Sequence, residues 1–110
     1  MAERGEAVDS VVSGGSILSG GCVRNCVLSR GVRVHRGAFV EDSVLMDNVD
    51  IGRHAKVRRA ILDKNVRVAP GETIGYDLKR DQKLGYAVTS SGIVVVAGIP
   101  SRVEISRLRS

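Results

Sequence analysis

The chain has 110 residues, 43% of them hydrophobic and 26% charged, which is typical of one globular domain and excludes a disordered segment. Seventeen Lys and Arg outnumber twelve Asp and Glu, giving a net charge of +5 that suits anionic ligands. Aromatic residues make up only 3% of the chain, so the stacking surface of a single-strand nucleic-acid binder is missing and we expect no nucleic-acid partner.

Residues 1–6 are polar and lack the apolar stretch of a secretory signal, and no apolar run reaches membrane-spanning length. We therefore expect a cytoplasmic location and no membrane partner. Cys22 and Cys26 stand without the further ligands that a zinc site needs. Because both fall where small residues recur, we expect small buried thiols in a reducing compartment.

Three near-copies of a seventeen-residue unit begin at residues 27, 44 and 61. Within each unit, large aliphatic residues recur in steps of six, six and five, which does not fit the 3.6-residue period of a helix. These residues are Leu28, Val34 and Val40, then Leu45, Ile51 and Val57, then Leu62, Val68 and Ile74. The pattern predicts a triangular coil with one inward aliphatic residue on each side, and stacked coils that share one core.

An earlier coil continues the inward series through Val12, Leu18 and Val23, with a step of sixteen from Val11 to Val27. The sequence thus predicts about four coils over residues 8–75, preceded by a lead-in at residues 1–7. Hexapeptide periodicity of this kind is typical of a single-stranded left-handed parallel β-helix. We therefore predict an all-β fold, although its crossovers oppose the usual right-handed rule for parallel strands.

Stacking at about 4.8 Å places residues seventeen apart directly above one another. Charges then alternate in four columns, which are Arg30–Asp47–Lys64, Arg33–Asp50–Arg67, Glu41–Arg58 and Asp42–Arg59. We expect these columns to form a solvated, self-paired wall, with each pair contributing about 0.2–1 kcal/mol. Glycines at the predicted corners, where a positive φ is useful, are Gly31, Gly37, Gly52 and Gly71.

Residues 76–110 follow the coil as a hairpin and a basic tail. Residues 75–84 are a polar connection with room for one helical turn. Residues 86–89 and 93–96 are two β-rich runs around Ser90-Ser91-Gly92, which predicts a hairpin, and we expect the 94–96 strand to pack along the side of the coil. Pro100 interrupts the second run, and residues 101–110 are expected to be an edge strand or a frayed end.

Residues 42–46 (DSVLM), the Ile51-Gly52 corner, residues 59–66 (RAILDKNV) and residues 91–96 (SGIVVV) resemble the carboxy-terminal β-helix domain of the glucose-1-phosphate adenylyltransferase (ADP-glucose pyrophosphorylase) family. The resemblance extends from about residue 5 to residue 96. It implies a regulatory and oligomerisation role in an enzyme of glycogen biosynthesis that makes ADP-glucose from ATP and glucose 1-phosphate.

The family's catalysis uses an amino-terminal nucleotide-binding domain with Mg²⁺ and ATP. This chain has no glycine-rich phosphate loop between a strand and a helix, and no carboxylate pair arranged for a metal. We therefore expect no catalytic residue, metal or cofactor in this chain, and no adenylyl transfer by the chain alone.

The resemblance also implies basic effector-binding residues just after the GIVVV strand. Aligned on residues 92–96, the first such position falls on Gly98, which is not basic, and the second falls on Arg102. Arg102 is thus the candidate effector-binding residue, since its planar guanidinium can bind a phosphorylated or carboxylate metabolite at two points. The alternative is a solvated tail residue.

Two other functions stay open. A hexapeptide-repeat acyltransferase would use a histidine as general base, and His35 and His54 are the candidates, although both lie beside corner glycines as ordinary turn residues would. A β-helix carbonic anhydrase is excluded, because it would need three zinc histidines and the chain has two. A stand-alone assembly module is the third reading. Because an open coil end must be capped or paired, we expect self-association or binding to the family's catalytic domain or subunits.

Overall fold

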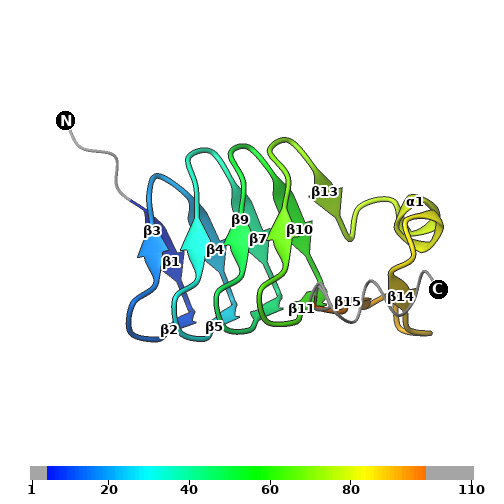
Figure 1. Ribbon diagram of the computed structural model, residues 1–110, viewed down its shortest axis with the longest axis horizontal. Helices are drawn as coiled ribbons and strands as arrows, with labels where there is room; N and C mark the ends of the chain where they lie inside the picture. Colours follow the sequence, from blue (N-terminus) through cyan, green and yellow to red (C-terminus); the bar gives the residue numbers. More distant parts are fainter. Residues whose placement is uncertain (1–4, 99–110) are drawn as a thin grey trace, which may run out of the picture.

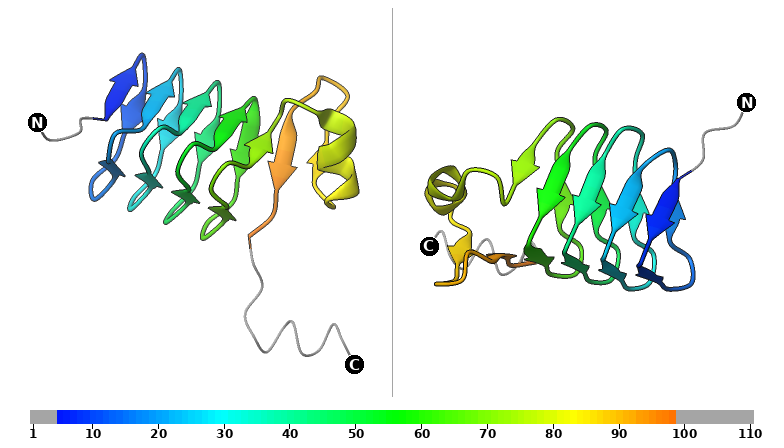
Figure 2. Two further views of the ribbon diagram at one scale, coloured as in Figure 1. Left: turned by 90° about the horizontal axis from the view of Figure 1, so that it is seen from above. Right: turned by 180° about the vertical axis from the view of Figure 1, so that it is seen from behind.

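The computed structural model describes residues 5–98, which form a β-solenoid of about four coils followed by a helix and a hairpin (Figure 1). Each coil adds one strand to each of three parallel sheets, named A, B and C here in the order in which the chain enters them. The views in Figure 2 show the strands of each sheet following one another along the length of the solenoid. The predicted all-β coil is confirmed.

The strand bounds follow the three sides of the coil. Sheet A contains β1 (Glu6–Val8), β4 (Cys22–Arg24), β7 (Phe39–Glu41), β10 (Lys56–Arg58) and β13 (Thr73–Ile74). Sheet B contains β2 (Val11–Val12), β5 (Val27–Leu28), β8 (Val44–Leu45), β11 (Ala60–Leu62), β15 (Val94–Val96) and β14 (Ala87–Val88). Sheet C contains β3 (Ile17–Leu18), β6 (Arg33–Val34), β9 (Asp50–Ile51) and β12 (Arg67–Val68).

The seventeen-residue register is confirmed. Val57 pairs with Val40, Leu62 with Leu45, and Val68 with Ile51. The first coil is one residue shorter, because Val11 pairs with Val27. Strand β1 begins at Glu6, two residues before the start expected at residue 8, and pairs with β4.

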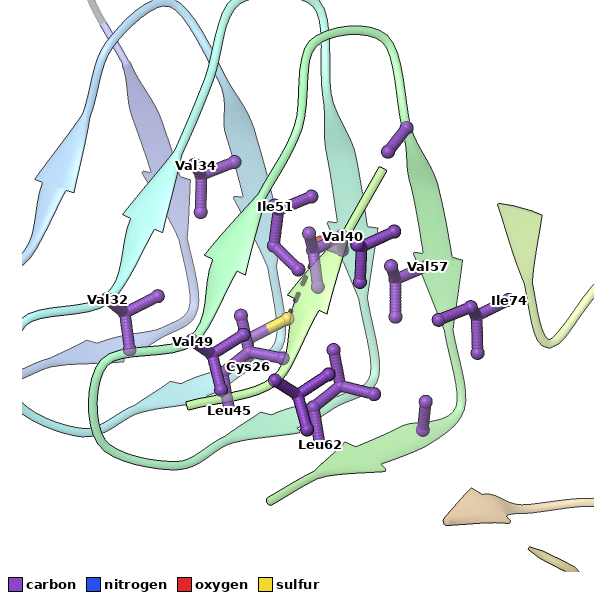
Figure 3. Packing of buried hydrophobic residues seen from close by; sticks show 14 of the residues in the cluster. Cys26, Val32, Val34, Val40, Leu45, Val49, Ile51, Val57, Leu62 and Ile74 are labelled. Atoms are coloured by element: carbon purple, nitrogen blue, oxygen red, sulfur yellow. Dashed lines mark hydrogen bonds between the residues drawn. The ribbon is translucent and has the colours of Figure 1, made fainter. Parts of the chain in front are cut away.

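The core is a column of aliphatic side chains inside the triangle (Figure 3). Leu28, Leu45 and Leu62 from sheet B are fully buried, and each such side chain contributes about 1.5–3 kcal/mol. The first coil departs from the prediction, since Val12 is 40% exposed and Leu18 is only half-buried. In the described part of the chain, these two residues have a coil stacked on one side only.

Tight corners separate the three sides. Gly31, Gly37 and Gly71 adopt the predicted positive φ, with values of 68°, 72° and 75°. The prediction for Gly52 is wrong, because the positive φ in that corner belongs to His54, at 60°. Gly52 is needed for space instead: a Cβ there would lie 2.7 Å from the backbone nitrogen of Pro70.

The charge columns are in the predicted register, with Asp50 opposite both Arg33 and Arg67. The expected ion pairs are wrong: within residues 5–98 none of the four columns forms a side-chain salt bridge. Asp50 instead binds His35, with 3.0 Å between Oδ1 and Nε2, and Asp42 accepts a 2.8 Å hydrogen bond from Asn25. Exposed Arg side chains lose conformational entropy when held in one geometry, so stacking alone does not fix them.

The far end of the solenoid is closed by the helix α1 (Leu78–Lys83) and the hairpin. Strand β15 joins sheet B parallel to β11, and β14 pairs with it antiparallel, which confirms the predicted hairpin and its docking. The Asp81 carboxylate, only 1% exposed, accepts a 2.9 Å hydrogen bond from the Gly75 amide. Arg58 covers the Tyr76 ring at 4.2 Å and donates a 2.9 Å bond to the Gly75 carbonyl.

Replacing Asp81 by Ala should lower the free energy of unfolding by about 1–3 kcal/mol, because the buried Gly75 amide loses its partner. Urea denaturation followed by circular dichroism measures this change. Lys79→Ala, on the exposed side of the same helix, is the control and should stay within about 0.5 kcal/mol of the unmodified chain. Equal stability of the Asp81 and Lys79 variants would contradict this role.

Candidate anion-binding site

The candidate site is the corner between sheets B and C on the last complete coil. Strand β11 ends at Leu62, and the turn closes with a 3.2 Å bond from the Val66 amide to the Asp63 carbonyl. Asn65 takes the left-handed conformation, with φ at 65°, which asparagine tolerates better than most residues. The turn leaves Lys64 exposed at its tip, and Arg67 lies exposed on the sheet C side of the same coil.

Strand β15 brings the end of the described chain to this corner. The Asp63 amide donates to the Val96 carbonyl at 3.0 Å. The Asp63 side chain then accepts from the Lys64 amide at 2.8 Å and from the Gly98 amide at 3.3 Å. These two bonds, with the Lys64 amide as the larger cause, lower the pKa of the Asp63 carboxyl. Gly98 is thus held beside Lys64 by a charged carboxylate.

The space at position 98 is too small for any side chain, which explains the glycine there. A Cβ there would lie 2.8 Å from the Lys64 carbonyl oxygen, closer than real Cβ contacts come. The basic residue that the family resemblance places at this position therefore does not fit this backbone. The exposed cation that the structure does bring to the corner is Lys64, which sequence reasoning missed because it lies in an earlier repeat.

Arg102, the predicted effector residue, lies outside the described residues. It follows Gly98 by four residues, a chain length that spans at most about 14 Å.

A second group of cations lies next to this corner on sheet C. Arg33 and Arg67 flank Asp50, and together with Asn48 they line a hollow of about 350 Å³. Asn48 holds the same left-handed corner position, one coil back, as Asn65. The carboxylate of Asp50 is engaged by His35, so the surface offers two guanidinium groups beside the Lys64 corner.

Both candidate histidines lie at the corner between sheets C and A, away from Lys64. His35 binds Asp50 within the same chain. His54 lies over Gly37, where a Cβ would come within 2.2 Å of Nδ1. Their contacts are those of turn residues. Within residues 5–98 no three His, Cys, Asp or Glu side chains lie close enough together to hold a metal ion.

The two cysteines differ. Cys26 is buried, as expected, and its Sγ is 3.4 Å from the Val40 carbonyl (Figure 3). Burial raises the pKa of the Cys26 thiol, so it is a poor nucleophile. The expectation of burial is wrong for Cys22, which is half-exposed on the outer side of sheet A opposite Phe39. In the described residues, no helix has the length and apolar character needed to cross a membrane.

Asp63→Ala should release residue 98 from the corner, which hydrogen exchange of the Gly98 amide measures by NMR. Because the pKa of Asp63 is lowered, the clamp is fully present above the ordinary aspartate pKa of about 3.9 and is lost as the pH falls through the lowered value. Gly98 protection should therefore fall on acidification in the unmodified chain. It should be low at every pH in the variant. Asp47→Ala, one coil back, is the control, and unchanged Gly98 exchange in Asp63→Ala would contradict the clamp.

Comparison with known proteins agrees with the hexapeptide coil. The family model of the GlmU-like C-terminal hexapeptide domain matches residues 1–96. Glucose-1-phosphate adenylyltransferase of Rhodopirellula baltica is 54% identical over 94 residues, which are 86% of this chain and 21% of the relative. The enzyme of Frankia casuarinae is 58% identical over 92 residues, 84% of this chain and 22% of the relative.

That of Geobacter metallireducens is 49% identical over 94 residues, 86% of this chain and 23% of the relative. The chain therefore spans little more than a fifth of the length of these relatives. With its hexapeptide coils and the matched domain model, the chain belongs to the GlmU-like C-terminal hexapeptide family and is similar to the C-terminal region of glucose-1-phosphate adenylyltransferases.

Proposed function

We propose that this chain is the C-terminal regulatory and assembly unit of a cytoplasmic glucose-1-phosphate adenylyltransferase of glycogen biosynthesis. Its regulatory site binds a phosphorylated or carboxylate effector between Lys64 and Arg102. The observation that carries this proposal is the fixation of Gly98 against the Asp63–Lys64 turn. This contact holds Gly98, the last described residue, beside the exposed Lys64.

The chemistry of the corner favours an anion. Lys64 is a compact point charge, whereas an arginine binds phosphate or carboxylate oxygens with two parallel hydrogen bonds. The nearby acid, Asp63, has both carboxylate oxygens engaged by backbone amides and is therefore a weaker competitor for the cations. Arg33 and Arg67 on sheet C add positive charge on the same side of the coil.

Adenylyl transfer itself is not assigned to these residues. The family's reaction uses ATP and Mg²⁺, and the donor set of residues 5–98 does not fit a metal site because no three carboxylate, thiol or imidazole groups converge. The proposed role of the chain is therefore to bind an effector and to associate with other subunits.

Isothermal titration with fructose 1,6-bisphosphate tests the regulatory site. Lys64→Ala and Arg102→Ala should each weaken binding by about tenfold or more, since each removes one charge-assisted contact to phosphate. Lys56→Ala is the control, because it removes the same charge from sheet A and should leave affinity unchanged. Affinity that is equal in all four proteins would remove the proposed site.

Two histidine variants and the oligomeric state separate the competing functions. Turnover of acetyl-CoA that is abolished by His35→Ala or His54→Ala would instead favour the acyltransferase. A chain that self-associates but binds no anion would favour the stand-alone assembly module.

A further inference from the structure

Sheet B carries an unbroken aliphatic ladder on its outer side. The parallel register places one aliphatic residue per strand in a single outward column, which is Val11, Val27, Val44, Ile61, Val95 and Ala87. Val11 is 62% exposed, Val27 46% and Ile61 39%. This face runs along the lower edge of the molecule through β2, β5, β11, β15 and β14 (Figure 1).

The other two sides of the coil differ from it. In the described residues, the corresponding column of sheet C is Ile17, Arg33, Asp50 and Arg67, and that of sheet A is Glu6, Cys22, Phe39, Lys56 and Thr73. Sheet B therefore has aliphatic side chains on both of its faces, which is typical of a sheet that packs against something on each side.

Charged residues border the ladder in a fixed order. On the edge that leads in from sheet A, the left-handed corner residues on successive coils are Asp9, Asn25, Asp42 and Arg59. On the edge that leads out to sheet C, the sequence is Arg30, Asp47 and Lys64. On both edges a carboxylate lies on the β8 coil and a cation on the β11 coil, where the neighbouring Asp63 carboxylate is engaged by the Lys64 and Gly98 amides.

This order makes the face complementary to itself in one arrangement. The strand order of sheet B is β14-β15-β11-β8-β5-β2, so its midpoint lies between β11 and β8. A two-fold axis at this midpoint, parallel to the strands, places β11 over β8 of a second copy, β15 over β5 and β14 over β2. Ile61 then meets Val44, Arg59 meets Asp42, and Lys64 meets Asp47, each pair occurring twice.

The other face-to-face arrangement is disfavoured by charge. A two-fold axis along the solenoid would place the two edges of each coil opposite one another. Asp42 would then face Asp47, and Arg59 would face Lys64, so both coils at the centre would carry like charges across the contact. The alternation along each edge thus selects the first arrangement, in which the two solenoid axes run antiparallel.

We propose that the outer face of sheet B pairs with the same face of a second copy. The two solenoids run antiparallel, related by a two-fold axis between β8 and β11. This deepens the assembly half of the proposed function by naming its surface. A hollow of about 500 Å³ bounded by Val44, Ile61 and Ile93 receives aliphatic side chains of the second copy. Six strands of two or three residues at a spacing of about 4.8 Å make a contact that is small for an interface, so the isolated dimer is weak and weakens further in salt.

Sedimentation velocity of the full chain between about 5 and 500 µM tests the contact, since a small interface calls for high protein concentration. The chain should shift from monomer to dimer. Ile61→Glu places a charge at the centre of the ladder and should weaken dimerisation by about tenfold or more. Ile17→Glu is the matched control: it makes the same change at an exposed isoleucine on sheet C and should leave the dimer intact.

A charge exchange tests the register. Asp47→Lys places two lysines opposite each other and should weaken the dimer, whereas adding Lys64→Asp to the same chain restores opposite charges and should restore the dimer. The double variant should still bind fructose 1,6-bisphosphate weakly, because Lys64 is lost. Ile61→Glu should keep anion binding while losing the dimer. Failure of the regulatory site and failure of the contact are therefore distinguishable.

Three results would overturn the proposal. The first is a chain that stays monomeric at the highest concentration. If that chain then dimerised after removal of residues 99–110, those residues would be the occupant of the outer face of sheet B. The second is loss of the dimer in Ile17→Glu but not in Ile61→Glu, which indicates end-to-end stacking through the edge strands. The third is a double charge variant no better than Asp47→Lys, which excludes the antiparallel register.

Discussion

The structure depends on the backbone pairing of each coil with the next at an interval of seventeen residues. This pairing places Leu28, Leu45 and Leu62 in one column inside the solenoid and Val27, Val44 and Ile61 in another outside it. Because side chains alternate between the two faces of a strand, a slip of one residue would exchange these two sets. The register therefore fixes both the core and the chemistry of each outer face.

The three outer faces differ because the register acts separately on each side of the triangle. Sheet C collects Arg33, Asp50 and Arg67, whereas sheet B collects aliphatic residues only. The alternating charges of the columns do not stabilise the coil through salt bridges, because the Arg–Asp neighbours form none in residues 5–98. Alternation avoids like charges in adjacent coils, and at the borders of sheet B it makes the surface self-complementary.

The segment after the last coil both closes the solenoid and completes the candidate site. Asp81 binds the backbone where the last coil ends, and β15 then returns to pair with β11. That return brings Gly98 against the Asp63 carboxylate beside Lys64, so the candidate anion-binding corner combines two segments that are distant in sequence. A parallel strand added outside the regular coil order thus links the outer face of sheet B, the candidate anion-binding corner and the end of the solenoid.

The amino-acid sequence by itself determined the coil period, the inward aliphatic columns, the hairpin and the family, because each is a local pattern or a repeat of one. Only the tertiary structure decided what depends on neighbours. Val12 is exposed because, within residues 5–98, a coil stacks on it from one side only, and Gly52 serves a close approach to Pro70 and not a positive φ. Lys64 enters the site, and Gly98 excludes a side chain, because β15 docks on β11, a contact that no local pattern in either segment encodes.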